Sequence, residues 1–255
     1  MRGKQTLVQL ANKHDRSHVW IRRQLDAVFV TKQNIAPKPI VIVADTKFWG
    51  RSYGVCVFRS PELKKNLWWN EVTNEKVVTY RYGRRILEER GWMFTAAVVD
   101  GRRGLARVFS DIPVQICIFH QMKRVTKYLT RRPETLAGQE LRALMLQLPK
   151  SNEHDFTKLL ADWHIRWKDF INEKTKIIGC NRWFYTHKNV RSAYLSLQTN
   201  LPCLFTYQKY PTLNIPNTTN CLDGSFSNLK KKLAVHHGLR QDRRYKAISE
   251  ILRGI

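Results

Sequence analysis

The sequence predicts an α/β protein in which a mixed β-sheet is flanked by helices. Short, largely β-branched apolar runs at residues 40–44 and 92–99 are typical of buried strands. Residues 75–90 and 121–200 instead have the apolar spacing of helices. With 255 residues and a hydrophobic content of 43%, the chain can bury a substantial core.

The charge balance indicates the class of partner. The chain has 45 Lys and Arg against 20 Asp and Glu, a formal net charge of +25. Such a charge favours nucleic acid, because each neutralised phosphate releases counterions, although anionic lipid is an alternative. No apolar run approaches 18 residues and no signal peptide is recognisable, so we expect a soluble cytoplasmic protein and no membrane partner. Five widely spaced cysteines without a CxxC pair indicate reduced thiols.

Residues 1–36 are expected to form a helix-turn-helix segment. One helix is predicted over residues 5–14 and a second from residue 18, each with its apolar positions on one face. The second helix would be capped by a serine and would present polar and basic residues to a DNA major groove. The expected DNA contacts are Ser17, His18, Arg22 and Arg23. An ordinary helical hairpin with a solvated basic face is the alternative.

A linker over residues 34–39 leads into the predicted sheet. The first strand, residues 40–44, runs directly into Asp45, and two further strands at 52–58 and 67–72 complete an antiparallel meander. A helix at 75–90 follows.

Two more strands are predicted to end at polar side chains. Residues 92–99 run into Asp100, and residues 113–119 end at His120. A mixed sheet would bring these strand ends together with that of Asp45. A single acid at a strand end can also simply open a turn.

An all-helical insertion is expected at about residues 121–213. It includes a helix at 141–148 and a tryptophan-rich stretch with Trp163, Trp167 and Trp183. The chain then returns to the sheet through a helix capped by Asn220.

Asp223 lies in the first turn of that returning helix. Leu222, Phe226, Leu229 and Leu233 form the apolar face of the helix, and Asp223 lies on the opposite side. A capping role for this acid is the alternative.

Asp45, Asp100 and Asp223 together suit two-metal phosphoryl transfer. Hard divalent cations take oxygen ligands, and a pair about 3.5–4 Å apart can activate an attacking oxygen and stabilise a leaving one. The abundant Lys and Arg would hold a polyanion against these acids.

Four motifs carry a resemblance to a known family: VIVADTKFWG, AAVVDGRRGL, QICIFHQMKR and IPNTTNCLDGSFSNLKKKL. As a set they resemble the bacterial Mutator-type insertion-sequence transposases, in the variant with a zinc-binding N-terminal segment, over nearly the whole chain from Lys4. The resemblance implies an RNase H-like core with an all-helical insertion and DDE-type cleavage and strand transfer. It implies that Asp45, Asp100 and Asp223 bind two Mg²⁺ or Mn²⁺ ions.

Cys117 and His120 match the C/D(2)H signature of that family. The resemblance and the position of His120 suggest a hydrogen bond near the scissile phosphate, whereas a buried cysteine followed by a strand-end histidine is the plain alternative. The family also implies double-stranded DNA partners, namely transposon ends and target, and a homodimer or larger assembly on DNA. A bacterial, nucleoid-associated location follows from the same resemblance.

Two features depart from the family pattern. Its third acid is usually Glu, whereas Asp223 is one methylene shorter. Zinc-binding cysteines do not precede the helix-turn-helix, and two ligands, Cys117 and His120, are too few for a structural zinc site, so no zinc is expected. We therefore interpret residues 1–36 as a truncated DNA-binding segment and residues 37–255 as the catalytic domain.

A basic tail completes the candidate DNA contacts. They are Lys230, Lys231, Lys232, Arg240, Arg243 and Arg244. Two other functions remain open: a non-catalytic DNA-binding transposon relic or regulator, and a metal-dependent nuclease that cuts without joining strands.

Overall fold

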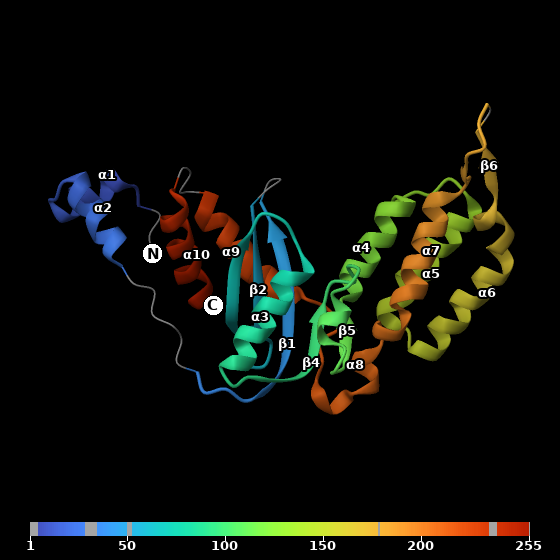
Figure 1. The fold of residues 1–255 in the computed structure, drawn as a ribbon, viewed down its shortest axis with the longest axis horizontal. Coiled ribbons are helices and arrows are strands. Elements are labelled where there is room, and N and C mark those ends of the chain that lie inside the picture. The colour runs from blue at the N-terminus through green and yellow to red at the C-terminus, as the bar shows by residue number, and fades with distance from the viewer. Residues whose placement is uncertain (1–4, 29–34, 50–52, 178, 235–238, 255) are drawn as a thin grey trace. The chain divides into compact units, whose positions relative to one another are not determined.

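The computed structural model describes residues 5–28, 35–49, 53–177, 179–234 and 239–254 (Figure 1). The chain forms two compact units: residues 1–94 with 220–255, and residues 95–219. Asn34, where the predicted linker begins, and Ser52, where the predicted second strand begins, lie outside the described residues.

The sheet has five strands and is mixed, as predicted. Its order is β3-β2-β1-β4-β5, with antiparallel pairing of β1 with β2 and of β2 with β3, and parallel pairing of β4 with β5. The strands are β1 (Pro39–Phe48), β2 (Gly54–Ser60), β3 (Lys65–Val72), β4 (Met93–Val99) and β5 (Val114–Ile116). The predicted antiparallel meander is therefore confirmed.

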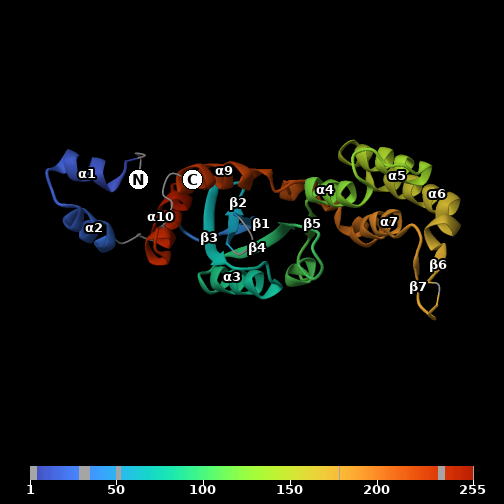
Figure 2. The same ribbon diagram turned by 90° about the horizontal axis from the view of Figure 1, so that it is seen from above.

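Three helices of the first unit cover the meander. Figure 2 shows α3 (Val77–Glu89) on one face of β1–β3, with α9 (Asn220–Ala234) and α10 (Gln241–Arg253) on the other. The side-chain amide of Asn66 on β3 donates to the Leu252 carbonyl at 2.9 Å, which ties α10 to the sheet. These contacts make the meander the core of the first unit.

Two short helices, α1 (Leu7–His14) and α2 (His18–Ala27), precede the sheet, as predicted. Asp15 ends α1 in the left-handed conformation, with φ of 49°. Ser17 caps α2, because the backbone N–H of Trp20 donates to its Oγ at 3.2 Å.

The second unit is mainly helical around its own apolar core. Its helices are α4 (Ile118–Leu129), α5 (Leu136–Gln147), α6 (Glu153–Asn172), α7 (Lys188–Asn200) and α8 (Thr206–Lys209). Short 3₁₀ helices lie at Ala106–Phe109, Leu148–Lys150, Leu201–Cys203 and Pro211–Leu213. In the described parts of the chain, no helix is long and apolar enough to cross a membrane.

Two sequence-based predictions in this unit are wrong. The strand predicted at 113–119 ends at Ile116, because the apolar run continues into helix α4, whose inner face also needs apolar side chains. The insertion is not wholly helical, since β6 (Lys174–Lys176) and β7 (Trp183–Tyr185) form an antiparallel hairpin. Trp183 therefore belongs to a strand and not to a helix.

Candidate functional site

Asp45 is held within a strand and is only 8% exposed. The prediction that it ends the strand is wrong: β1 continues to Phe48, and Asp45 lies opposite Val57 of β2. Backbone pairing extends the strand here, since a ladder does not require the apolar side chains that end at Ala44. The Thr46 backbone N–H donates to Asp45 Oδ1 at 2.8 Å, which orients the carboxylate.

Asp223 lies in the first turn of α9 with its side chain exposed, as predicted. The helix begins at Asn220 itself, so the prediction that Asn220 precedes and caps it is wrong by one residue. Burial raises the pKa of the Cys221 thiol, the Arg59 charge opposes this, and the charges of Asp223 and Asp45 both raise it further. Two of the three predicted acids therefore act electrostatically on one thiol of the first unit.

Asp100 directly follows β4 in the second unit, as predicted. Arg124 of α4 reaches it, with Nη2 3.4 Å from Asp100 Oδ1, and its Nη1 donates to the Gly101 carbonyl. Gly101 also lets Asn200 of α7 approach the strand end closely, because a Cβ there would lie 2.6 Å from the Asn200 side-chain nitrogen. The strand end and the first turns of α4 are thus locked together.

His120 lies in the first turn of α4 and not at a strand end, where the sequence pattern predicts it. Its Nδ1 is 3.4 Å from Thr219 Oγ1, and the Thr219 backbone N–H donates to Cys117 Sγ at 3.3 Å. Burial raises the pKa of the Cys117 thiol, but hydrogen bonds from His120 and Thr219 and the charge of His120 outweigh it, so the net pKa is lowered. The Cys-x-x-His motif thus forms a polar cluster at the start of α4.

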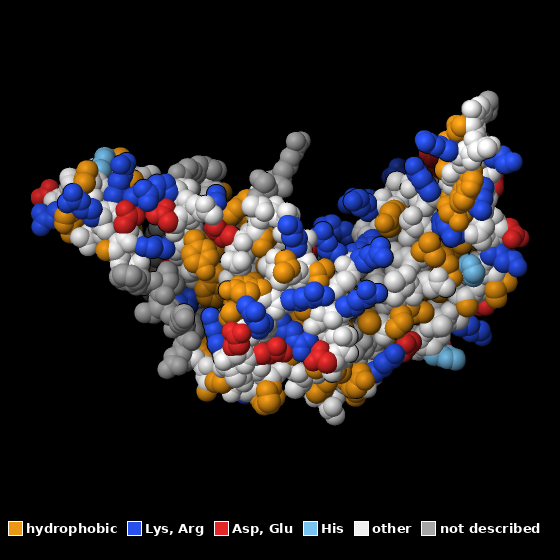
Figure 3. Space-filling model, viewed as in Figure 1, with side chains coloured by type: hydrophobic (Ala, Val, Ile, Leu, Met, Phe, Trp, Pro, Cys, Tyr) orange, Lys and Arg blue, Asp and Glu red, His pale blue; other side chains and the backbone are white. Residues whose placement is uncertain are grey.

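A cavity of about 880 Å³ lies along α4, with Asp100 and His120 in its wall. Its positively charged lining residues are Lys123, Arg124, Lys127, Arg131 and Arg142. Asp100 is the one acidic residue among those that line it. In the space-filling view, Lys and Arg side chains gather in the region of α4 (Figure 3). The arrangement is suited to an anion that lies beside a strand-end carboxylate.

Most of these cations lack a protein partner in the parts of the chain that the structure describes. Arg124 is engaged by Asp100, whereas Lys123, Lys127 and Arg131 are exposed and form no ion pair there. The Nε of Arg142 is buried without a hydrogen-bond acceptor among the described residues. A buried donor of this kind favours a ligand that supplies an acceptor.

Sequence reasoning missed this cavity, although a signal was available. Lys123 and Lys127 are four residues apart and lie on one face of α4, and Arg131 comes two residues after the helix ends. This spacing falls within the predicted helical insertion, but it does not show that Asp100 and Arg142 lie beside these residues.

Carboxylate oxygens are the ligands that hard divalent cations prefer, so binding of Mg²⁺ or Mn²⁺ by the three predicted acids remains a prediction. Asp45 and Asp223 belong to the first unit, and Asp100 and His120 to the second. Over residues 5–28, 35–49, 53–177, 179–234 and 239–254, no three His, Cys, Asp or Glu side chains form a group that could hold a metal ion.

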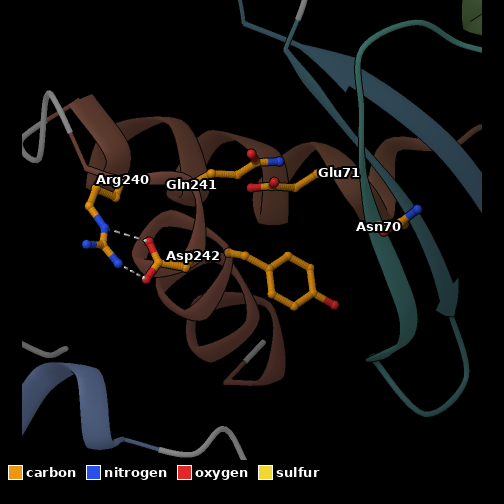
Figure 4. A pocket seen from close by; sticks show the side chains of 6 residues that line it. Asn70, Glu71, Arg240, Gln241 and Asp242 are labelled. Carbon is orange, nitrogen blue, oxygen red and sulfur yellow. Dashed lines mark hydrogen bonds and ion pairs between the residues drawn. The ribbon is translucent and has the colours of Figure 1, made fainter.

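The arginines of the predicted basic tail are engaged with carboxylates. Arg240 donates through both Nε and Nη2 to Asp242, at 3.2 and 2.8 Å, beside a cavity of about 690 Å³ that Glu71 also lines (Figure 4). These hydrogen bonds lower the pKa of Asp242 to about 2. Arg243 donates to Asp26 of α2 at 2.6 and 2.7 Å, and Arg244 lies 3.7 Å from Glu71. Their role as phosphate contacts remains a prediction.

The other predicted DNA contacts lie at the surface. Ser17, His18, Arg22 and Arg23 are exposed on α2 and its cap, and Lys230 and Lys231 are exposed on α9, while Lys232 is half-buried.

Comparisons with known proteins add one weak structural similarity. No family model matches the sequence, and no curated protein matches it. Among solved structures, the chain is similar to one described as "Drosophila P element transposase strand transfer complex", with a TM-score of 0.35 and 11% sequence identity. The match covers 93% of this chain and 85% of that chain, but a TM-score this low does not indicate an activity.

Proposed function

We propose that the chain is a DDE-type DNA transposase that cleaves DNA at transposon ends and transfers the strand into target DNA. One observation carries the proposal: Asp100, at the end of β4, lies in the wall of a cavity whose lining also includes five Lys and Arg side chains. A carboxylate beside a surface that binds a polyanion repels that polyanion, which weakens binding. Cations that bridge the carboxylate and the polyanion would remove this repulsion. The four family-like motifs place Asp45, Asp100 and Asp223 as the acids that would hold those cations.

The sheet supports an RNase H-like core as part of this proposal. An antiparallel meander followed by parallel strands, in the order β3-β2-β1-β4-β5, is the arrangement expected of such a core. The helices of residues 118–209 are inserted between the second and third acids, as the resemblance implies.

The proposed reaction proceeds through a hydrolysis step and a transesterification step. In the first, water attacks a phosphorus at the transposon end, and the bond to the 3′ oxygen breaks to release a 3′-OH. In the second, that 3′-OH attacks a target phosphodiester, so that one P–O bond forms as another breaks. Bound Mg²⁺ or Mn²⁺ would activate the attacking oxygen and stabilise the leaving oxygen.

The residues of the chain have distinct roles in this scheme. Asp45, Asp100 and Asp223 supply the oxygen ligands, and His120 donates a hydrogen bond to a phosphate oxygen. The cations along α4 hold the DNA backbone, while α2 and Lys230 to Lys232 contact flanking DNA. The active form is a homodimer or larger assembly on paired DNA ends.

Strand cleavage and joining on short duplexes that carry the element's ends test the proposal. Wild-type protein is compared with Asp100→Ala and with Asp169→Ala, which removes an exposed carboxylate of α6. We expect products that require Mg²⁺ or Mn²⁺ and that disappear only in Asp100→Ala.

The nature of the products distinguishes the three functions. Joined strands indicate a transposase, whereas cleavage without joining indicates a nuclease. If wild-type and Asp100→Ala bind the DNA equally and neither cuts it, the proposal is wrong and the chain is a DNA-binding relic or regulator.

A further inference from the structure

The hairpin of β6 and β7 exposes large aromatic side chains. Trp183 is 49% exposed and Phe184 47% exposed. Figure 1 shows the hairpin projecting from the end of α6, away from the helices of its own unit. Aromatic side chains of this size usually lie in a core or an interface, so their exposure requires an explanation.

One face of the hairpin combines aromatic and cationic side chains. Lys174 pairs with Tyr185 and Lys176 with Trp183, and residues directly opposite in an antiparallel pair share a face. The Lys174 ammonium lies 4.0 Å from the centroid of the Trp183 ring, and the Arg191 guanidinium lies 4.1 Å from that of Tyr185. The cations therefore stand directly beside the aromatic rings.

The charge of the segment is strongly positive. Residues 173–191 contain one acid, Glu173, whose carboxylate is already engaged by His187 at 3.0 Å. The basic residues of the segment are Lys174, Lys176, Arg182, Lys188 and Arg191. Charge complementarity therefore selects an anionic occupant over a neutral apolar one.

Nucleic acid is the anionic partner that uses both features of this face. Phosphates take the Lys and Arg side chains, while sugars and base edges take aromatic contacts. A two-stranded ribbon also fits the major groove of B-DNA. An anionic membrane could also bind the Lys and Arg side chains. A flat membrane surface, however, would not require a narrow two-stranded hairpin.

We propose that the β6–β7 hairpin is a DNA-binding arm that enters a groove of the duplex. Lys174, Lys176 and Arg191 contact phosphates, and Trp183, on the same face as the two lysines, contacts sugars and bases. That the nucleic acid is DNA rests on the proposed function. The arm itself depends only on the side chains of the hairpin.

Fluorescence anisotropy with a labelled duplex carrying the element's ends, in EDTA and over a salt series, tests the arm. Trp183→Ala should weaken binding about tenfold or more and leave the salt slope unchanged, because it removes apolar contact surface without removing charge. Lys174→Ala with Lys176→Ala should also weaken binding and reduce the slope of log affinity against log salt by about 1.8, or 0.9 per phosphate.

Matched controls lie on the neighbouring helix α6. Lys158→Ala with Lys168→Ala removes the same charge from exposed positions, and Ile165→Ala removes an apolar side chain that is 70% exposed. These variants should bind nearly as wild-type does, and circular dichroism verifies that every variant is folded. Hairpin variants that bind no worse than the controls would overturn the proposal.

Two further outcomes separate the arm from its alternatives. If the aromatic variant changes the sedimentation of DNA-free protein but not its DNA affinity, the hairpin is a self-association contact and the proposal is wrong. Because binding is measured without metal, a wild-type protein that binds through the hairpin but never cleaves overturns the transposase and not the arm.

Discussion

Asp223 offers a test of chemistry at a single exposed residue. Its side chain lies on the outer side of α9, so its substitution should leave folding intact. We expect Asp223→Asn to reduce cleavage about 100-fold or more, since loss of even an outer partner of a metal ligand costs roughly 10- to 100-fold. Asp223→Glu keeps the charge and restores the length usual in the resembling family, so cleavage should equal or exceed that of wild-type.

Quantitative cleavage assays with both variants, together with their urea unfolding midpoints, check this prediction. Full activity of Asp223→Asn would show that this carboxylate is not a metal ligand and serves only the start of α9.

Cys117 should make stability depend on pH. Its pKa in the folded chain lies below the ordinary value of 9.0, so between these two pKa values the unfolded chain binds more protons. The contribution of this thiol to the free energy of unfolding therefore rises with pH until the pH reaches the pKa of the thiol in the unfolded chain. It is lost as the pH falls through the pKa of the thiol in the folded chain. The destabilisation by Cys117→Ala should grow as pH rises toward 9.0.

Cys203 provides a comparison of opposite sign. Burial raises the pKa of its thiol, against a smaller effect of Lys209, so its contribution is lost as pH rises above 9.0. Urea unfolding of wild-type, Cys117→Ala and Cys203→Ala over a pH series measures both trends. A Cys117 effect that does not change with pH would mean that His120 and Thr219 do not stabilise the thiolate.

Single residues also show what sequence patterns can and cannot predict. The position of Asp100 is predicted correctly, because β4 stops at the same residue as its apolar run. The positions of Asp45 and His120 are predicted less well: backbone pairing continues past Asp45, and the apolar run before His120 passes from β5 into α4 without a break. Side-chain polarity alone does not reveal where a backbone ladder stops.

At the scale of elements, the docking of α3 depends on Gly83. A Cβ at this position would lie 2.7 Å from two ring carbons of Trp68, which is itself packed edge-on against Phe58. Overpacking of this kind costs about 1–3 kcal/mol, whereas alanine gains about 1 kcal/mol of helix propensity over glycine. We expect Gly83→Ala to lower the free energy of unfolding of the first unit by up to about 2 kcal/mol.

Gly224 is the matched control, in α9 of the same unit. A Cβ there meets nothing within 4 Å, so Gly224→Ala should raise the free energy of unfolding by about 0.5–1 kcal/mol. Urea titrations followed by circular dichroism compare the two variants. Equal effects would indicate that Trp68 moves aside freely and that α3 does not require a small residue.

Elements differ in how well their sequence pattern predicts them. Strands β1 to β4 and helices α1 to α3 follow from apolar runs and helical spacing. The β6–β7 hairpin does not, because its strands are three residues each and join directly to long helices. A strand of three residues is too short to show the alternation of apolar and polar side chains that distinguishes a strand from the end of a helix.

At the scale of the whole molecule, a net charge of +25 predicts a polyanionic partner but not where it binds. Arg240, Arg243 and Arg244 stand near carboxylates, so much of their charge is already compensated. Lys123, Lys127 and Arg131, which line the α4 cavity, form no ion pair within the described chain. Where the polyanion binds therefore depends on which Lys and Arg side chains are paired with carboxylates in the folded chain. The net charge does not give this information.

The salt dependence of DNA affinity measures how much of that charge contacts phosphate. Replacing Lys123, Lys127 and Arg131 by alanine should reduce the slope of log affinity against log salt by up to about 2.7, or 0.9 for each phosphate that the variant no longer neutralises. The control replaces Lys150, Lys158 and Lys168, which are exposed in the same unit and remove the same net charge. If both triple variants change the slope equally, the α4 cavity does not contact phosphate, and only the overall field of the protein attracts DNA. A large change confined to the α4 variant, with unchanged unfolding midpoints, would place the DNA backbone in the cavity beside Asp100.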